Sequence, residues 1–185
     1  MKEIVQDGAD VLREIAPPVP EELFGSAELR RIVTIMEDAL DPELEGVALA
    51  APQIGVSYRI FVVRKDRTII PPPMKEGDQA VEDTASEART FVAQNEVYIN
   101  PEIVRTSRKR ANVDEGCLSV RGIYGTTKRH ERVTIRARNL DGSRFERGGG
   151  GLMAQIFEHE IDHLNGILFI DHAEHLVEIN HATVA

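Results

Sequence analysis

The sequence has only one cysteine among its 185 residues, Cys117, so it cannot form an intramolecular disulfide. A sole cysteine in an intracellular chain serves as a small buried hydrophobe, as a nucleophile or as a metal ligand. Its presence alone does not choose among these three roles.

Long apolar runs are also missing. No stretch approaches the about 20 apolar residues that a membrane-spanning helix needs. The first ten residues carry Lys2, Glu3, Asp7 and Asp10 and contain no apolar core segment, so they lack the pattern of a secretory signal. We therefore expect a cytoplasmic protein that makes no membrane contact.

Basic residues are the minority among the charged ones. Lys and Arg number 22 against 31 Asp and Glu, which gives a formal net charge of −9. This charge argues against non-specific binding along a nucleic-acid backbone. The one basic run, residues 105–110, is interpreted as a solvated strand end or loop. The chain length predicts one domain that spans residues 1–185.

The spacing of apolar residues predicts an α+β fold. Residues 26–40 have an apolar stripe at helical spacing, with Ser26 as the N-cap, and residues 152–164 have the same period. Strands are expected at three places, and a turn at Asp141-Gly142 should make the last of them a hairpin with residues 144–147. The expected strands are residues 58–63, 97–104 and 133–138. Residues 65–96, rich in proline and acidic residues, are expected to form a surface excursion between two strands.

The late helix carries the sequence His159-Glu160-Ile161-Asp162-His163. Residues four apart lie on one face of a helix, so both imidazoles can reach one metal ion. Glu160 is one position away from that face, where its carboxylate can reach a water bound to the metal. This H-E-x-x-H pattern is typical of hydrolytic metal sites, which need at least one more protein ligand.

Several residues could supply the third ligand. The extended protease pattern H-E-x-x-H-x-x-G-x-x-H matches as far as Gly166, but Phe169 stands where its third histidine should be. Glu174 and Glu178 follow the helix with little chain for a return. Cys117 is the better candidate, because a thiolate is a good ligand for a divalent transition metal.

Residues 46–55 are mostly small and include one amide side chain, Gln53. Small residues allow a backbone to approach a ligand closely. The Gln53 amide could donate to a developing oxyanion. Alternatively, this is a tightly packed loop in which Gln53 is hydrogen-bonded to the backbone.

Together, three segments in this order resemble the motifs of the peptide deformylase family. They are residues 46–53, Glu115-Gly116-Cys117-Leu118-Ser119 and the helix motif at 159–163. The likeness covers most of the chain, including residues 98–103 and 164–169 and the strand that follows Arg129. The sequence departs from the family pattern at Ala48, Arg121 and Glu158, where glycine, proline and glutamine are usual. These departures bear on substrate range and rate, and not on the type of reaction.

The resemblance implies a peptide deformylase-like fold, with antiparallel strands packed around the late metal-binding helix and an early amphipathic helix. It implies one divalent metal ion held by Cys117, His159 and His163. Iron(II) is the expected physiological ion, and zinc, nickel or cobalt could also occupy such a site.

The resemblance further implies that the substrate is the N-terminal formyl-methionine of newly made polypeptides, from which formate is released. Glu160 would carry the proton, while the Gln53 side chain and the Leu118 backbone N–H would stabilise the oxyanion. The ribosome is a possible partner, although residues 172–185 contain no lysine or arginine for electrostatic docking.

An apolar pocket for the methionine side chain is expected beside the metal, and three charged residues are expected to support the ligands. The expected pocket residues are Val47, Leu118, Leu152, Gln155 and Ile156, and the expected supporting residues are Glu115, Arg129 and Asp162. Two alternatives are a metallopeptidase, which would use a different third ligand, and a non-catalytic module stabilised by a metal.

Overall fold

The structure is a computed structural model that describes residues 2–68 and 95–179. Most of the excursion predicted at residues 65–96 lies outside the described residues. At its edges, Lys65–Arg67 form a 3-10 helix, η4, and Asn95 already begins a strand. No helix in the described ranges is long and apolar enough to cross a membrane.

The larger of two sheets has five antiparallel strands in the order β1-β2-β3-β6-β7. Its β6–β7 hairpin turns at Gly142, whose φ of 87° lies in the left-handed region, so the predicted hairpin is confirmed. The strands are β1 (Ala48–Ala50), β2 (Ile60–Arg64), β3 (Asn95–Thr106), β6 (Arg132–Arg138) and β7 (Arg144–Gly150).

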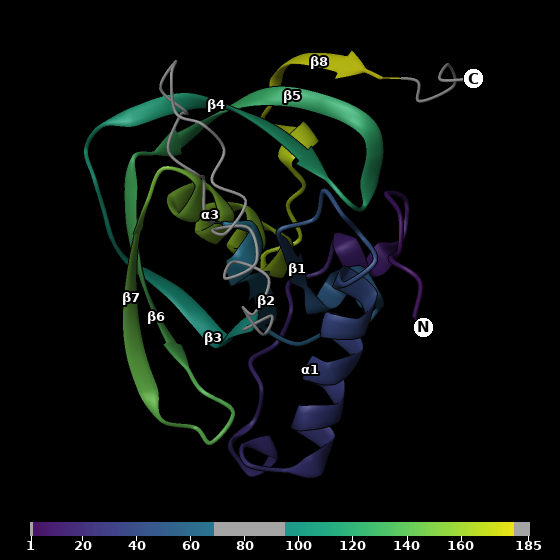
Figure 1. The fold of residues 1–185 in the computed structure, drawn as a ribbon, viewed down its shortest axis with the longest axis vertical. Helices are drawn as coiled ribbons and strands as arrows, with labels where there is room; N and C mark the ends of the chain where they lie inside the picture. The colour runs from purple at the N-terminus through teal and green to yellow at the C-terminus, as the bar shows by residue number, and fades with distance from the viewer. Residues whose placement is uncertain (1, 69–94, 180–185) are drawn as a thin grey trace, which may run out of the picture.

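Both faces of this sheet are covered at its β1–β2 end. Phe61 and Val63 of β2 point to the same side and pack with helix α3 (Leu152–Leu164). Ile60 and Val62 point to the opposite side and pack with helix α1 (Ala27–Leu40). This alternation explains why β2 is apolar at successive positions. In Figure 1, β1 and β2 accordingly lie between α3 and α1.

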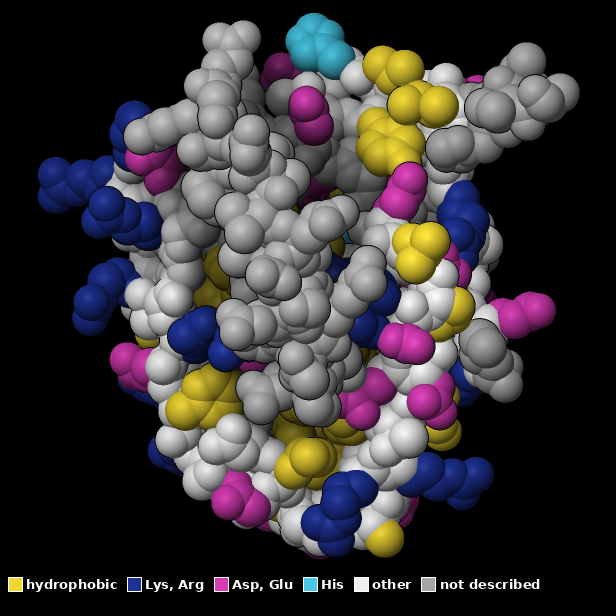
Figure 2. All heavy atoms as spheres, viewed as in Figure 1, with side chains coloured by type: hydrophobic (Ala, Val, Ile, Leu, Met, Phe, Trp, Pro, Cys, Tyr) yellow, Lys and Arg dark blue, Asp and Glu magenta, His cyan; other side chains and the backbone are white. Residues whose placement is uncertain are grey.

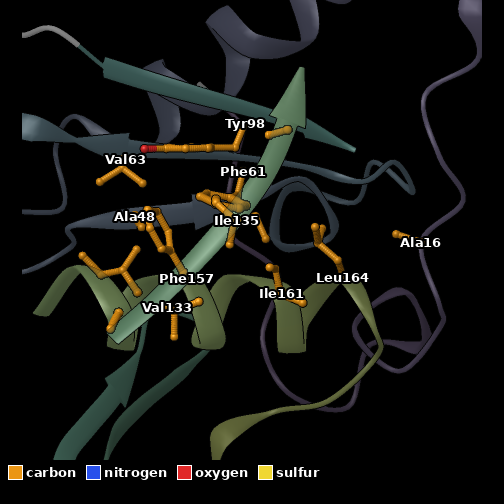
Figure 3. Close-up of a cluster of buried hydrophobic side chains, with 14 residues drawn as sticks. Ala16, Ala48, Phe61, Val63, Tyr98, Val133, Ile135, Phe157, Ile161 and Leu164 are labelled. Atoms are coloured by element: carbon orange, nitrogen blue, oxygen red, sulfur yellow. The ribbon is translucent and has the colours of Figure 1, made fainter. Parts of the chain in front are cut away.

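The core beneath α3 contains a cluster of aromatic rings. The Phe61 and Tyr98 rings stack with their centroids 4.6 Å apart, and Phe157 of α3 meets Tyr98 edge-on at 5.5 Å. Figure 3 shows these rings with Ile161 and Leu164 in the space between the helix and the strands. The apolar side of α3 is thus attached to the five-stranded sheet by the packing of buried apolar side chains.

The smaller sheet has three antiparallel strands in the order β4-β5-β8. It passes over α3 on the side away from the aromatic core (Figure 1). Most of its side chains are at least partly exposed, and β8 is exposed throughout. The strands are β4 (Arg110–Cys117), β5 (Val120–His130) and β8 (Glu174–Glu178).

Both predicted helices are present. Ser26 accepts a hydrogen bond from the Leu29 amide as the N-cap of α1, and α3 ends where Asn165-Gly166 was expected to stop it. The predicted strands at 58–63, 97–104 and 133–138 correspond to β2, β3 and β6. Besides η4, four short 3-10 helices lie in the described residues, three before β2 and one after α3. They are η1 (Asp10–Leu12), η2 (Glu21–Leu23), η3 (Ala51–Ile54) and η6 (Phe169–Asp171).

The segment at residues 46–55 is more regular than a loop, because β1 and η3 lie within it. The basic run at residues 105–110 joins β3 to β4 and is largely exposed, as expected. On the face shown in Figure 2, the described side chains of both charge signs are interspersed.

Candidate metal centre and its cleft

Three possible metal ligands come together where α3 meets the end of β4. One ligand atom each from Cys117, His159 and His163 lies within 4.8 Å of the other two. The Cys117 Sγ is 3.2 Å from the His163 Nε2, and the two imidazole rings are 4.9 Å apart at their centroids. Zinc-type sites have metal–sulfur and metal–nitrogen distances of about 2.0–2.3 Å, so a separation of this size fits a shared ion.

Cys117 is brought to α3 by the tight connection between β4 and β5. The Gly116 Cα faces the Tyr124 ring, and a Cβ there would lie 2.7 Å from that ring. The amide of Ser119, two residues further on, donates to Cys117 Sγ at 3.4 Å. The glycine beside the cysteine therefore allows the close packing of β4 on β5 that positions the sulfur.

His159 is oriented by a buried acid. Its Nδ1 is 3.2 Å from the Glu115 carboxylate, which leaves Nε2 for a metal. Arg129 donates two hydrogen bonds to Glu115, at 2.7 and 3.0 Å, and a third to Asp162 at 2.6 Å. Burial raises the pKa of Glu115, but its bonds to His159 and Arg129 outweigh this and lower the pKa to about 2. Glu115 is thus an anion beside the ring at neutral pH.

His163 and Glu160 are almost fully buried, at 1% and 4% exposure. Burial lowers the pKa of His163, which favours the neutral ring that binds metal. Burial also raises the pKa of Glu160 to about 7. One Glu160 oxygen has no hydrogen-bond partner among the described residues. A buried carboxylate with such an oxygen, next to three candidate metal ligands, is suited to proton transfer.

Gln53, in η3, lies beside Cys117. Its side-chain carbonyl accepts from the Ala50 amide at 2.8 Å, which fixes the direction of its NH₂ group. That group donates to Ser119 Oγ at 3.1 Å and points to Cys117 Sγ at 3.6 Å. The backbone hydrogen bond expected of a packed loop is therefore present, and the amide also faces the candidate metal site.

A cleft of about 290 Å³ opens directly over these residues. Its walls come from residues 45–48 before and within β1, from the β4–β5 connection, and from the first half of α3. Glu160, Gln53, Cys117 and His159 lie along it. All five residues expected to form a methionine pocket line it: Val47, Leu118, Leu152, Gln155 and Ile156.

The three departures from the family pattern have distinct places in the structure. Ala48 lines the cleft. Arg121, also in the lining, makes a bidentate ion pair with Glu43 at 2.7 and 3.0 Å. Glu158 points away from the cleft and accepts from the His130 amide at 2.8 Å, with its other oxygen 2.7 Å from the His130 ring. The Arg121–Glu43 pair was not predicted, because its members are 78 residues apart.

Comparison with known proteins decides the family. The family model described as polypeptide deformylase matches residues 1–178. The chain belongs to the peptide deformylase family. The sequence-based prediction of an enzyme that removes the N-terminal formyl group is thereby confirmed, and the metallopeptidase and non-catalytic alternatives are not supported.

Individual deformylases agree with this assignment. A peptide deformylase of Carboxydothermus hydrogenoformans is 36% identical over 94% of this chain and 94% of its own length. One of Thermomicrobium roseum is 46% identical over 70% of this chain and 63% of its own length. The structure of a class I type b peptide deformylase from Acinetobacter baumannii with Met-Ala-Ser bound superposes with a TM-score of 0.73, at 32% identity, over 91% of this chain and 97% of that one. The deformylase fold predicted from the sequence is confirmed.

Proposed function

We propose that this deformylase hydrolyses the formyl amide of N-formyl-methionyl peptides at the Cys117, His159 and His163 site, with Glu160 as the proton carrier. The observation that carries the proposal is the juxtaposition of three ligand atoms within 4.8 Å and the buried Glu160 carboxylate along one cleft. The same cleft has apolar walls that suit a methionine side chain.

The donor set fits a divalent transition metal. Two imidazole nitrogens and one cysteine sulfur are ligands that such ions prefer, and His159 has the supporting carboxylate usual for a metal-bound histidine. When bound, the ion would acidify a coordinated water and polarise the formyl carbonyl. We propose iron(II) as the physiological ion, with zinc, nickel and cobalt as substitutes. Elemental analysis of anaerobically purified protein, with activity per ion, tests this choice.

Glu160 would take the proton of the attacking water and deliver it to the methionine nitrogen as the carbon–nitrogen bond breaks. A pKa of about 7 suits both acceptance and donation near neutral pH. The products are then formate and a free amino terminus.

Gln53 and the Leu118 backbone N–H would donate to the carbonyl oxygen as its charge develops. The Gln53 amide is already directed at the site by its bond from Ala50. Losing one such donor costs about 2.7–4 kcal/mol of transition-state stabilisation. Gln53→Ala should therefore bind metal normally and lose about 100- to 1000-fold in kcat. An unchanged kcat would remove this role.

The bound Met-Ala-Ser of the Acinetobacter baumannii deformylase supports the proposed substrate, because this peptide remains when formyl-Met-Ala-Ser loses its formyl group. Formyl-methionine begins newly made chains, so the proposal includes the cytoplasm as location and the ribosome as a neighbour. Substituting Ile156→Trp should fill the apolar wall and change discrimination among first residues of the peptide. Equal discrimination in that variant would argue against this pocket.

The test of the function is formate release from formyl-Met-Ala-Ser by the metal-loaded protein. Acetyl-Met-Ala-Ser is the matched control for cleavage of a larger acyl group. Release of formate is expected, without cleavage between Met and Ala. Cleavage of the internal bond would instead indicate a peptidase. The Cys117→Ser variant should lose metal affinity, and intact affinity would point to a different third ligand.

A further inference from the structure

Residues 5–7, which are far away in the sequence, form hydrogen bonds with Gln53 and with the connection between Cys117 and β5. The Val5 amide donates to the Gln53 carbonyl at 2.9 Å, and the Asp7 amide donates to the Ser119 carbonyl at 2.8 Å. Between them, the Gln6 side-chain amide donates to the Leu118 carbonyl at 3.0 Å. Three successive residues thus bind Gln53, Leu118 and Ser119, and the first two of these carry the proposed oxyanion donors.

The Gln6 contact acts on a peptide unit that also reaches the sulfur. The Leu118 carbonyl and the Ser119 amide belong to one peptide group, which is planar and trans. Its N–H end donates to Cys117 Sγ at 3.4 Å, and its carbonyl end accepts from Gln6. Because the group is rigid, holding the carbonyl fixes the direction of the N–H towards the sulfur.

The other polar groups of Ser119 are bonded to different partners. Ser119 is fully buried, and its hydroxyl accepts from Gln53 while its carbonyl accepts from Asp7. The Gln6 side chain is exposed, and its amide also donates to the nearby Ile4 carbonyl at 3.0 Å, so two hydrogen bonds fix its direction. Within the described residues, Gln6 is the side chain that holds the Leu118 carbonyl.

We propose that Gln6 is a positioning residue of the metal site. It aligns the Leu118–Ser119 peptide so that the Ser119 amide donates to the metal-binding sulfur, and it holds Leu118, whose own N–H faces the substrate oxygen. This rests on the ligand role of Cys117 and on the Leu118 role in the proposed function.

The variants that test this are Gln6→Glu, which keeps the shape but replaces the donor, and Gln6→Ala, which removes the side chain. Glu3→Ala, at an exposed residue of the same segment, is the matched control. All are loaded with cobalt(II). The sulfur-to-cobalt charge-transfer band, amide hydrogen exchange across residues 117–120, and kcat and KM for formyl-Met-Ala-Ser are then measured.

For both Gln6 variants, we expect exchange across residues 117–120 to be about two- to tenfold faster, the range that corresponds to one lost hydrogen bond. The charge-transfer band should move to longer wavelength, because a sulfur that loses an N–H donor holds its electrons less tightly. The value of kcat should fall by about the same two- to tenfold factor, with little change in KM. Glu3→Ala should match the wild type in all three readouts.

A band and an exchange rate equal to those of the wild type in Gln6→Glu would overturn the positioning role. Faster exchange with an unchanged band would also overturn it, since Gln6 would then stiffen the connection without acting on the sulfur. If the wild-type protein itself released no formate, the proposed function would fail, while the band and the exchange rate would still report on Gln6.

Discussion

The two sides of helix α3 are attached to the rest of the molecule by different forces. Towards the five-stranded sheet, Phe157, Ile161 and Leu164 are buried among the aromatic and aliphatic side chains of the core. Towards the three-stranded sheet, the contacts are hydrogen bonds and ion pairs. They join Gln155 to the Asp114 carbonyl, Glu158 to His130, His159 to Glu115, and Asp162 to Arg129.

The two sides of α3 therefore have different effects on stability and on the metal site. Apolar burial is non-directional and scales with area, so the side facing the aromatic core supplies folding energy. Hydrogen bonds contribute less net energy but fix direction, so the polar side sets the orientation of His159 relative to Cys117. Substitutions on the apolar side should therefore change mainly the free energy of unfolding, and substitutions on the polar side should change mainly the metal affinity.

The largest effect is expected on the apolar side. Phe157→Ala removes a fully buried ring that meets both Phe61 and Tyr98, and should lower the free energy of unfolding by about 3–5 kcal/mol. Denaturant titration of the metal-free protein measures it. The metal affinity of the folded fraction should change little. A large loss of affinity would contradict the proposal that the apolar side of α3 supplies stability alone.

On the polar side, Glu115→Gln should weaken metal binding about 10- to 100-fold, because His159 loses its charged partner. The unfolding free energy should fall by less than in Phe157→Ala. Competition with a chelator measures the affinity. Glu146→Gln, in an exposed ion pair with Arg136, is the control and should leave it unchanged. Equal affinities in both variants would show that Glu115 does not support the ligand.

The end of α3 provides a smaller test. Gly166 has a φ of 74°, and a Cβ there would lie 2.6 Å from the Arg13 carbonyl oxygen. Gly166→Ala should lower the unfolding free energy by at least about 1–2 kcal/mol, because backbone strain is joined by the clash of the new Cβ with the Arg13 carbonyl. Gly148→Ala is the matched control, because its nearest neighbour atom, Thr134 Oγ1, would be 3.7 Å away. Thermal unfolding that ranks the two variants in the opposite order would contradict this reading of the turn.

The smallest effect is expected at Glu158, a polar-side residue that does not touch the ligands. Glu158→Gln keeps one acceptor for the His130 amide and should change the unfolding free energy by less than about 1 kcal/mol. Metal affinity should stay at the wild-type value. A marked loss of affinity would show that all the polar contacts of α3 act together on the metal site.

Sequence reasoning succeeded where the information is local. The helical period of residues 152–164 and the spacing of His159 and His163 place two candidate ligands on one face without any knowledge of the fold. Strand β2 could be recognised because both of its sides are buried, which makes it apolar throughout.

The three-stranded sheet could not be predicted from local sequence patterns. Strand β4 alternates between exposed and less exposed positions but has few apolar residues, and β8 is exposed along its whole length, so neither has a clear apolar pattern in the sequence. Cys117 was selected by its chemistry and by family resemblance, since its position beside His163 depends on this sheet. The Gln6 contact links residues 112 apart, and no local pattern encodes it.

The most direct test of the proposed mechanism is formate release per bound metal ion, measured for the wild type and Glu160→Gln. The substitution keeps the shape of a buried side chain that follows the proposed ligand His159 but removes its ability to carry a proton. We predict one bound ion per chain in both proteins and a rate about 100- to 10,000-fold lower in the variant. Loss of the ion from Glu160→Gln, or a rate equal to that of the wild type, would contradict the account.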